Sequence, residues 1–214
     1  MTMHATQTTQ EGAIPSSVEE WDYRCQWDPH FGDTPYTVTN NPEQTIAHGG
    51  CVPVLQTVVA RSLCGLEVEP PGLAAWNVAN GMRTPNNGTK RISWNLFAIQ
   101  TGLKQDVIGA SLEEIGNALA VGGIVVASLK TPDRVGLGTP SGHVVGFRAV
   151  SEAGVTKVID VNSPRNTSLE WDILDILPYV VSNLRHLRGP RKLSAGLHTA
   201  SRAELLRATA TKRG

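Results

Sequence analysis

Two residues far apart in the chain, Cys51 and His143, are of the types that nucleophilic catalysis uses. A thiolate attacks a carbonyl carbon, while a neighbouring imidazole takes up a proton and later returns it. Asp160 and Asn162 follow His143 closely enough to lie on a returning strand, and either side chain can orient an imidazole. These residue types indicate acyl transfer through a covalent thioester.

Cys51 lies at the predicted start of a buried helix. The residues that follow it repeat at the spacing of one helix face: Leu55, Val58, Val59, Ser62 and Leu63. Pro53 fits only in the first turn, so the helix is predicted to begin at Gly50 or Cys51. The positive end of a helix dipole favours the thiolate form of a cysteine. Gly49 and Gly50 are expected to leave room for a substrate backbone near the sulfur. A small buried cysteine without function is the alternative.

His143 opens a predicted β-hairpin that is rich in β-branched and aromatic residues and returns over 155–161. If the turn centres on residues 153–154, or one residue earlier, odd-numbered residues pair with even-numbered ones across the hairpin. His143 then shares a face with Asp160 and Asn162, because residues two apart point the same way. A slip of one residue would separate them, so the register decides whether His143 has a partner.

An amide side chain near Cys51 can donate a hydrogen bond to a developing oxyanion without adding a charge. Gln26 and Gln44 are the two candidates. Gln26 is favoured because it lies in a short predicted strand over 23–26. Gln44 instead follows Asn40-Asn41-Pro42, which is a loop signal.

Four short motifs occur in a specific order along the chain. They are Tyr23-Arg24-Cys25-Gln26-Trp27-Asp28-Pro29, Gly50-Cys51-Val52-Pro53, Gly142-His143 and Asp160. Their order resembles that of the papain-like cysteine peptidases of the bacteriocin-processing type (family thirty-nine), over roughly Trp21 to Pro164. The resemblance implies Cys51 as nucleophile, His143 as base, Asp160 as the orienting acid and Gln26 as the oxyanion-hole amide. Val52 departs from the family pattern, which has glycine there.

In size and N-terminal pattern the chain is also similar to the peptidase parts of actinobacterial phage lysins. That likeness implies a lysis protein that cleaves peptide bonds of bacterial peptidoglycan. Such a protein would stay in the cytoplasm until released and then act on the cell wall. Two alternatives stay open: a papain-like binding module that has lost its activity, and a papain-like peptidase that acts on a protein leader.

The composition is that of a globular enzyme with 214 residues, of which 40% are hydrophobic. No segment approaches the ~20 apolar residues of a membrane span. Residues 1–20 are polar and lack the apolar centre of a signal peptide, so export by that route is not expected. The three cysteines form no even disulfide framework, and neither zinc-ligand spacing nor a phosphate loop occurs. No metal or cofactor is therefore expected.

Further patterns predict helices over 72–82 and 93–100, and a capping box, Ser111 to Glu114, opens a helix that stops at Gly122-Gly123. Residues 124–129 form a nearly all-apolar predicted strand. The polar loop over 130–142 is expected to form one wall of a cleft. Because helices come first and the sheet second, the predicted class is α+β with a papain-like fold.

Charge divides the chain into unequal parts. Residues 1–184 hold 11 basic and 18 acidic residues, whereas 185–214 hold 8 basic and 1 acidic. We expect a disordered tail over 1–18, a peptidase domain over 19–184 and a basic extension over 185–214. The extension can dock on an anionic wall polymer, or it is a solvated, partly helical tail. It carries no aromatic residue to stack on bases, so nucleic-acid binding is not expected.

Overall fold

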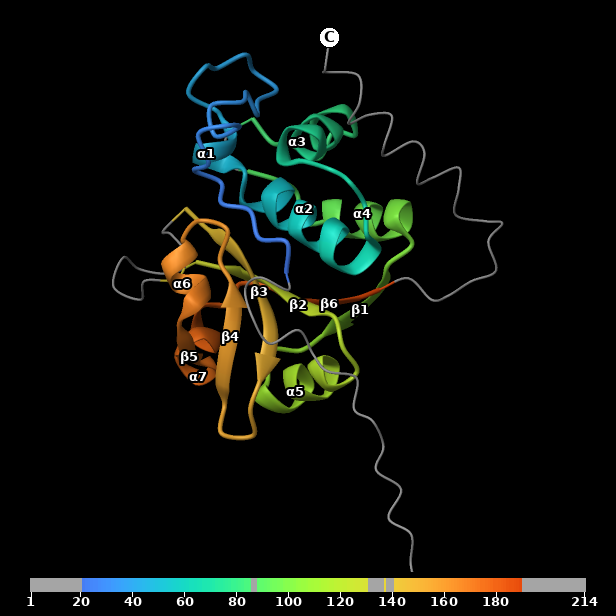
Figure 1. Cartoon of the computed structure of the whole chain (residues 1–214), viewed down its shortest axis with the longest axis vertical. Helices are drawn as coiled ribbons and strands as arrows, with labels where there is room; N and C mark the ends of the chain where they lie inside the picture. The colour runs from blue at the N-terminus through green and yellow to red at the C-terminus, as the bar shows by residue number, and fades with distance from the viewer. Residues whose placement is uncertain (1–20, 86–87, 131–136, 138–140, 190–214) are drawn as a thin grey trace, which may run out of the picture.

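The computed structural model describes residues 21–85, 88–130, 137 and 141–189, and these residues form one antiparallel sheet with helices on both faces (Figure 1). The expected disordered tail over 1–18 and most of the basic extension, from residue 190 onward, lie outside the described residues.

The helical side comes first in the chain. It consists of α1 (Ile46–Gly49), α2 (Cys51–Cys64), α3 (Pro70–Ala79) and α4 (Ser93–Thr101). The helices predicted over 72–82 and 93–100 are confirmed as α3 and α4, with shifted ends. Pro70 starts α3 early, since a proline fits the first turn of a helix. Within the described part of the chain, no helix is long and apolar enough to cross a membrane.

The sheet has the strand order β1-β6-β2-β3-β4-β5, and each neighbouring pair is antiparallel. Its strands are β1 (Lys104–Ile108), β2 (Ile124–Leu129), β3 (His143–Val150), β4 (Val155–Ile159), β5 (Glu170–Asp172) and β6 (Leu184–Arg188). The apolar strand predicted over 124–129 is confirmed as β2.

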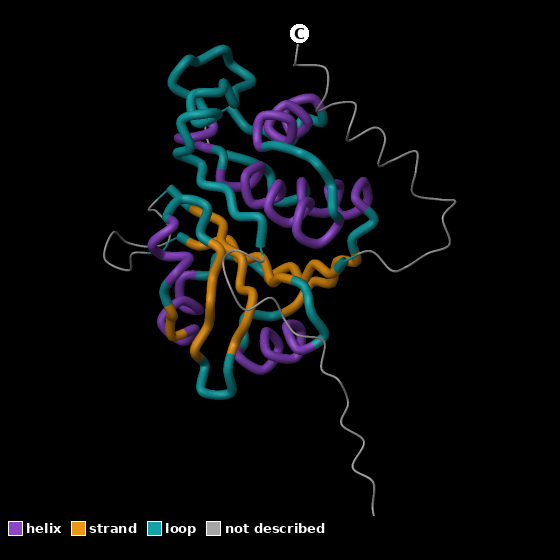
Figure 2. The backbone as a smooth tube through the Cα atoms, viewed as in Figure 1, coloured by secondary structure: helices purple, strands orange, loops and turns teal. Residues whose placement is uncertain are grey.

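Short helices cover the opposite face of the sheet: α5 (Leu112–Ala120), α6 (Pro164–Ser168) and α7 (Ile173–Ile176), followed by a 3-10 turn at Leu177–Tyr179. Figure 2 shows the strands between two groups of helices, with α1 to α4 on one side and α5 to α7 on the other. The predicted N-cap is confirmed, because the Ser111 hydroxyl accepts a hydrogen bond from the Glu114 backbone N–H at 3.2 Å.

Both faces of the central strands are buried, each in its own apolar cluster. In β2, Ile124 and Val126 pack with the helices of the first side, whereas Val125 and Ala127 pack with α5 and α7. Successive side chains of a strand point to opposite faces. A strand buried on both faces is therefore apolar at nearly every position, as β2 is.

Two features differ from the sequence-based expectations. The strand predicted over 23–26 is wrong: the Gln26 N–H donates to the Val161 carbonyl at 2.7 Å, but the chain turns at once, with Asp28 N–H bonding to Cys25. The segment around Gln26 thus forms a backbone hydrogen bond just beyond the end of β4 but does not add a strand to the sheet. The sheet also continues past the expected domain end at residue 184, because β6 lies between β1 and β2.

Candidate active site

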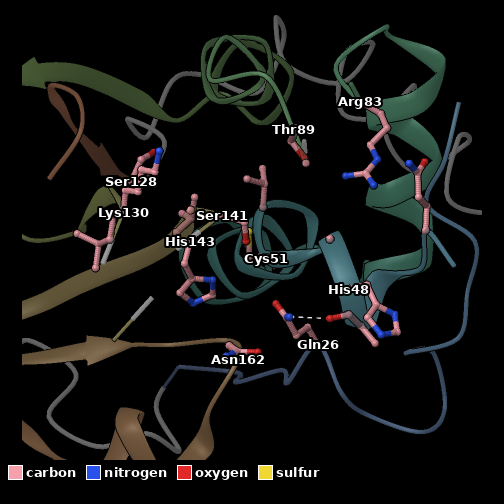
Figure 3. A pocket seen from close by; sticks show the side chains of 18 of the residues that line it. Gln26, His48, Cys51, Arg83, Thr89, Ser128, Lys130, Ser141, His143 and Asn162 are labelled. Atoms are coloured by element: carbon pink, nitrogen blue, oxygen red, sulfur yellow. Dashed lines mark hydrogen bonds between the residues drawn. The ribbon is translucent and has the colours of Figure 1, made fainter. Parts of the chain in front are cut away.

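Cys51 is the first residue of α2, with Gly50 as N-cap, so the predicted helix start is confirmed. The thiol is half-buried and lines a cleft of about 710 Å3 between the helical side and the sheet (Figure 3). Gln26 and Ala47 line the cleft from the helical side. His143 and Asn162 line it from the sheet side.

Only one of the two glycines before Cys51, Gly49, borders the cleft as was expected. A Cβ atom on Gly50 would lie 2.5 Å from the Ile46 carbonyl oxygen, and one on Gly49 would lie 2.9 Å from Nη1 of Arg83. Close packing on the Ile46 backbone therefore requires glycine at position 50, and the expectation is wrong for Gly50. Gly49 does line the cleft, where it faces the end of the Arg83 side chain. Val52 is buried in the core, so the departure from the family pattern is accommodated by packing.

His143 and Asp160 form a buried pair. Nε2 of His143 lies 2.7 Å from Oδ1 of Asp160, and the two residues are only 4% and 1% exposed. This bond leaves Nδ1 as the ring nitrogen that is free to exchange a proton with a thiol. Figure 3 shows the imidazole beside Cys51 on the same side of the cleft.

The hairpin register brings the pair together. Gly146 pairs with Ile159 and Phe147 with Val158, so odd-numbered residues oppose even-numbered ones near the site, as predicted. Nearer the turn, Ala149 pairs with Lys157, so odd-numbered residues there oppose odd-numbered ones. A bulge between Phe147 and Ala149 separates the two registers. One extra residue in the bulge thus aligns His143 with Asp160.

The Asp160 carboxylate is held by further donors. It accepts hydrogen bonds from Nδ2 of Asn166 at 2.8 Å and from the Asn162 backbone N–H at 2.9 Å. The Asn162 side chain points elsewhere, since its Oδ1 accepts from Nε1 of Trp27 at 2.6 Å. Of the two residues that can orient the imidazole, the structure thus places Asp160 against His143.

The environment favours the charged forms of both partners. Burial lowers the pKa of His143, but hydrogen bonds to Asp160 and Cys51 outweigh it and raise this pKa to about 10. Burial raises the pKa of Asp160, yet the hydrogen bond and the charge of His143 hold it below its ordinary value. The pair is therefore an imidazolium and a carboxylate at neutral pH.

This ionisation predicts a pH-dependent stability. An unfolded histidine loses its proton near pH ~6.5, whereas folded His143 keeps it up to about 10. The stabilisation is thus complete below the unfolded pKa and is lost as pH rises toward the folded one. Cys51→Ala is the background for this test, because a thiolate paired with the imidazolium would give up the proton that His143 keeps. Between pH 6 and 8, the free energy of unfolding of Cys51→Ala relative to the double variant Cys51→Ala/His143→Gln should fall by about 1 kcal/mol, as measured by urea denaturation.

His186 provides the matched control. It is buried, its Nε2 lies 2.8 Å from the Gly122 carbonyl oxygen, and burial lowers its pKa. The lowered pKa gives the opposite sign, so the difference between wild type and His186→Gln should rise slightly up to about pH 7 and stay flat from there to pH 8. A flat profile for His143→Gln as well would contradict the charged pair.

Gln26 lies beside Cys51 at the cleft, and its Oε1 is buried without a hydrogen-bond partner among the described residues. Its Nε2 donates to the Ala47 carbonyl at 2.8 Å, and the residue is 7% exposed. An amide nitrogen carries two hydrogens, so one N–H stays available to the cleft. Gln44 also lines the cleft, but its amide accepts from Thr37 and donates to the Pro85 carbonyl.

Sequence reasoning missed two features of the cleft. Arg83 lines it with a buried guanidinium that lies 4.3 Å from the centroid of the Tyr36 ring. Trp27 and His48 form an edge-to-face pair with centroids 5.5 Å apart on one wall. Nothing in the local sequence around Arg83 marks it, because its partners come from distant segments.

The structure offers no evident metal centre within the ranges it describes, where no three His, Cys, Asp or Glu side chains are grouped to hold an ion. His30 instead pairs with Asp28 at 2.8 Å, and His48 lies 3.1 Å from the Thr45 hydroxyl.

A solved structure shares the architecture. The peptidase domain of Streptococcus ComA, a bi-functional ABC transporter involved in a quorum sensing pathway, matches with a TM-score of 0.50 and 14% sequence identity. The match covers 67% of this chain and 93% of that domain. No protein-family model and no curated protein matches the sequence. The likeness confirms the predicted α+β, papain-like fold.

Proposed function

We propose that this chain is a cysteine peptidase that cleaves amide bonds through a thioacyl-enzyme. The observation that carries the proposal is the buried 2.7 Å contact between His143 and Asp160 beside a half-buried Cys51 at the start of α2. A thiol at a helix N-terminus, an imidazole and an orienting acid are the parts that such chemistry needs. The papain-like fold supports the same activity.

The geometry suggests a role for each group. The imidazolium of His143 and the dipole of α2 stabilise a thiolate at Cys51, which attacks the substrate carbonyl carbon. The Cys51 backbone N–H and the free N–H of Gln26 donate to the oxyanion. His143 then protonates the leaving amine, and water, which gives a proton back to His143, hydrolyses the thioester. Asp160 keeps the imidazole oriented throughout.

For the substrate, we propose peptide bonds of bacterial peptidoglycan, cleaved by a phage lysin component that reaches the wall after release from the cytoplasm. The support is the similarity in size and N-terminal pattern to the peptidase parts of actinobacterial phage lysins. The part of the basic extension that follows β6 would hold an anionic wall polymer by charge. A second candidate is cleavage of a protein leader, since the similar fold of ComA is the peptidase domain of a transporter.

Incubation of the full chain with purified actinobacterial peptidoglycan, and separately with leader peptides, tests these proposals. Mass spectrometry should show new peptide termini in the peptidoglycan that are missing with Cys51→Ala. Cleavage of leader peptides alone would replace the lysin proposal with the second candidate. If neither material is cleaved while Cys51 is alkylated no faster than Cys25, the peptidase proposal is wrong, and the fold is then an inactive binding module.

The oxyanion role of Gln26 predicts a specific loss. Gln26→Ala should lower kcat by about 10²–10³, the range for removing one oxyanion donor, with little change in KM. Gln44→Ala is the matched control, because it removes a second cleft amide that is bonded elsewhere. Steady-state kinetics on one cleavable peptide measure both variants. A large loss of kcat in Gln44→Ala, and not in Gln26→Ala, would identify Gln44 as the oxyanion donor.

A further inference from the structure

Arg83 is a buried cation at the edge of the cleft, and no carboxylate among the described residues pairs with it. The residue is 6% exposed, and its Nε and Nη1 atoms are buried without any hydrogen-bond partner in the described part of the chain. No carboxylate among these residues forms an ion pair with it. A buried charge costs free energy unless it is paired, so such a group is most easily explained by a ligand that completes it.

The surroundings fix the guanidinium in place. Its Cζ lies 4.3 Å from the centroid of the Tyr36 ring, and the group packs so closely on Gly49 that a Cβ there would lie 2.9 Å from Nη1. The backbone of Arg83 is bridged to Thr89. Figure 3 shows the guanidinium pointing from the helical side into the space that Cys51 also faces. A rigid fork of this kind can receive a planar anion with little loss of side-chain entropy.

The charges that line the cleft agree with an anionic ligand. Among the described residues that line the cleft, Arg83, Arg91 and Lys130 are cationic, and Glu43 alone carries a carboxylate. The chain up to residue 184 has the opposite balance, with 18 acidic and 11 basic residues. The basic character is therefore local to the cleft and not a property of the domain.

We propose that Arg83 binds a carboxylate of the substrate close to the scissile bond, so that the enzyme prefers acidic peptides. This inference rests on the proposed peptidase function and names its substrate class. The carboxylate belongs either to an acidic residue or to a free chain terminus. Both present the same planar anion, which a guanidinium binds through two parallel N–H bonds.

Alkylation of Cys51 tests the proposal without any peptide substrate. Iodoacetate and iodoacetamide transfer nearly the same group to sulfur with loss of iodide, but only iodoacetate carries a carboxylate. The ratio of their rate constants cancels the thiolate population and reports recognition of the anion. Arg83→Met should lower the iodoacetate-to-iodoacetamide ratio at Cys51 by about tenfold, the size expected for one hydrogen bond to a charged group, as measured by mass spectrometry of the Cys51 peptide.

Arg91→Met is the matched control, since it removes an exposed arginine from the same cleft whose guanidinium donates to the Val181 carbonyl. This variant should change the ratio by no more than about threefold, because exposed charges are screened. An unchanged ratio in Arg83→Met, or equal losses in both variants, would overturn the proposal. Peptide cleavage plays no part in the readout, so failure of the peptidase proposal would be seen separately.

A second measurement uses the wild-type protein and so does not depend on the folding of a variant. Glutarate should slow labelling of Cys51 by iodoacetamide, whereas its neutral analogue glutaramide should not. Equal protection by the two compounds, or protection by inorganic phosphate alone, would contradict a carboxylate site. For a peptide that the enzyme cleaves, replacing an acidic residue by its amide, or amidating the C-terminus, then identifies which carboxylate Arg83 binds.

Discussion

Cys51→Ala should abolish peptide cleavage, with activity at least ~10⁴-fold below wild type, the scale for loss of a catalytic nucleophile. The protein should stay folded, because the change removes one half-buried sulfur at a cleft and not from the core. Cleavage of peptidoglycan or of a peptide derived from it, followed by mass spectrometry, measures the loss. Circular dichroism and the thermal midpoint check the fold.

The chain supplies its own matched controls. Cys25 and Cys64 are also half-buried, but Cys25 precedes Gln26 and Cys64 ends α2 at the far end from Cys51. Cys25→Ala and Cys64→Ala should keep most of the activity, and iodoacetamide should label Cys51 before either of them. Full activity in Cys51→Ala, or faster labelling of Cys64, would refute the assignment of the nucleophile.

Local signals in the sequence were sufficient to predict the helix that carries Cys51. Pro53 restricts the start of α2 to one or two positions, and the apolar spacing after it defines the buried face. For the hairpin, the sequence left two registers open, one that places His143 on the same face as Asp160 and one that separates them. The bulge between Phe147 and Ala149 selects the register, and a bulge follows from packing of the whole sheet, which a short segment does not reveal.

Other features depend on contacts between distant segments. In β6, Leu184, His186 and Leu187 are buried beside Arg185 and Arg188, and the charges suggested a tail where the structure has a strand. The buried positions could have indicated the strand, but an inner position in the sheet is set by β1 and β2. The sequence near Arg83 did not indicate that this residue lines the cleft. Its environment is formed by Tyr36 and Gly49, more than thirty residues earlier in the chain.

The second large effect concerns the imidazole. His143→Ala should reduce kcat nearly as far as Cys51→Ala, because the thiol and the imidazole act as one unit. The double variant should be no worse than either single one, since the effects of such residues are strongly non-additive. Iodoacetamide should also alkylate Cys51 more slowly near neutral pH in His143→Ala, because the imidazolium beside the thiol is removed. Kinetics and alkylation of the same preparations measure both effects.

Variants of the acid decide what orients the imidazole. Asp160→Asn keeps the size of the side chain but loses the charge that supports the imidazolium, so kcat should fall by about 10³–10⁴. Asn162→Ala is the control, because the Asn162 side chain bonds to Trp27 and not to His143, and its effect should stay below about tenfold. If both changes had small and equal effects, neither residue would orient His143, and the buried 2.7 Å contact would serve the fold alone. A loss confined to Asp160→Asn would show that this carboxylate orients the imidazole, in the register that the bulge in β3 sets.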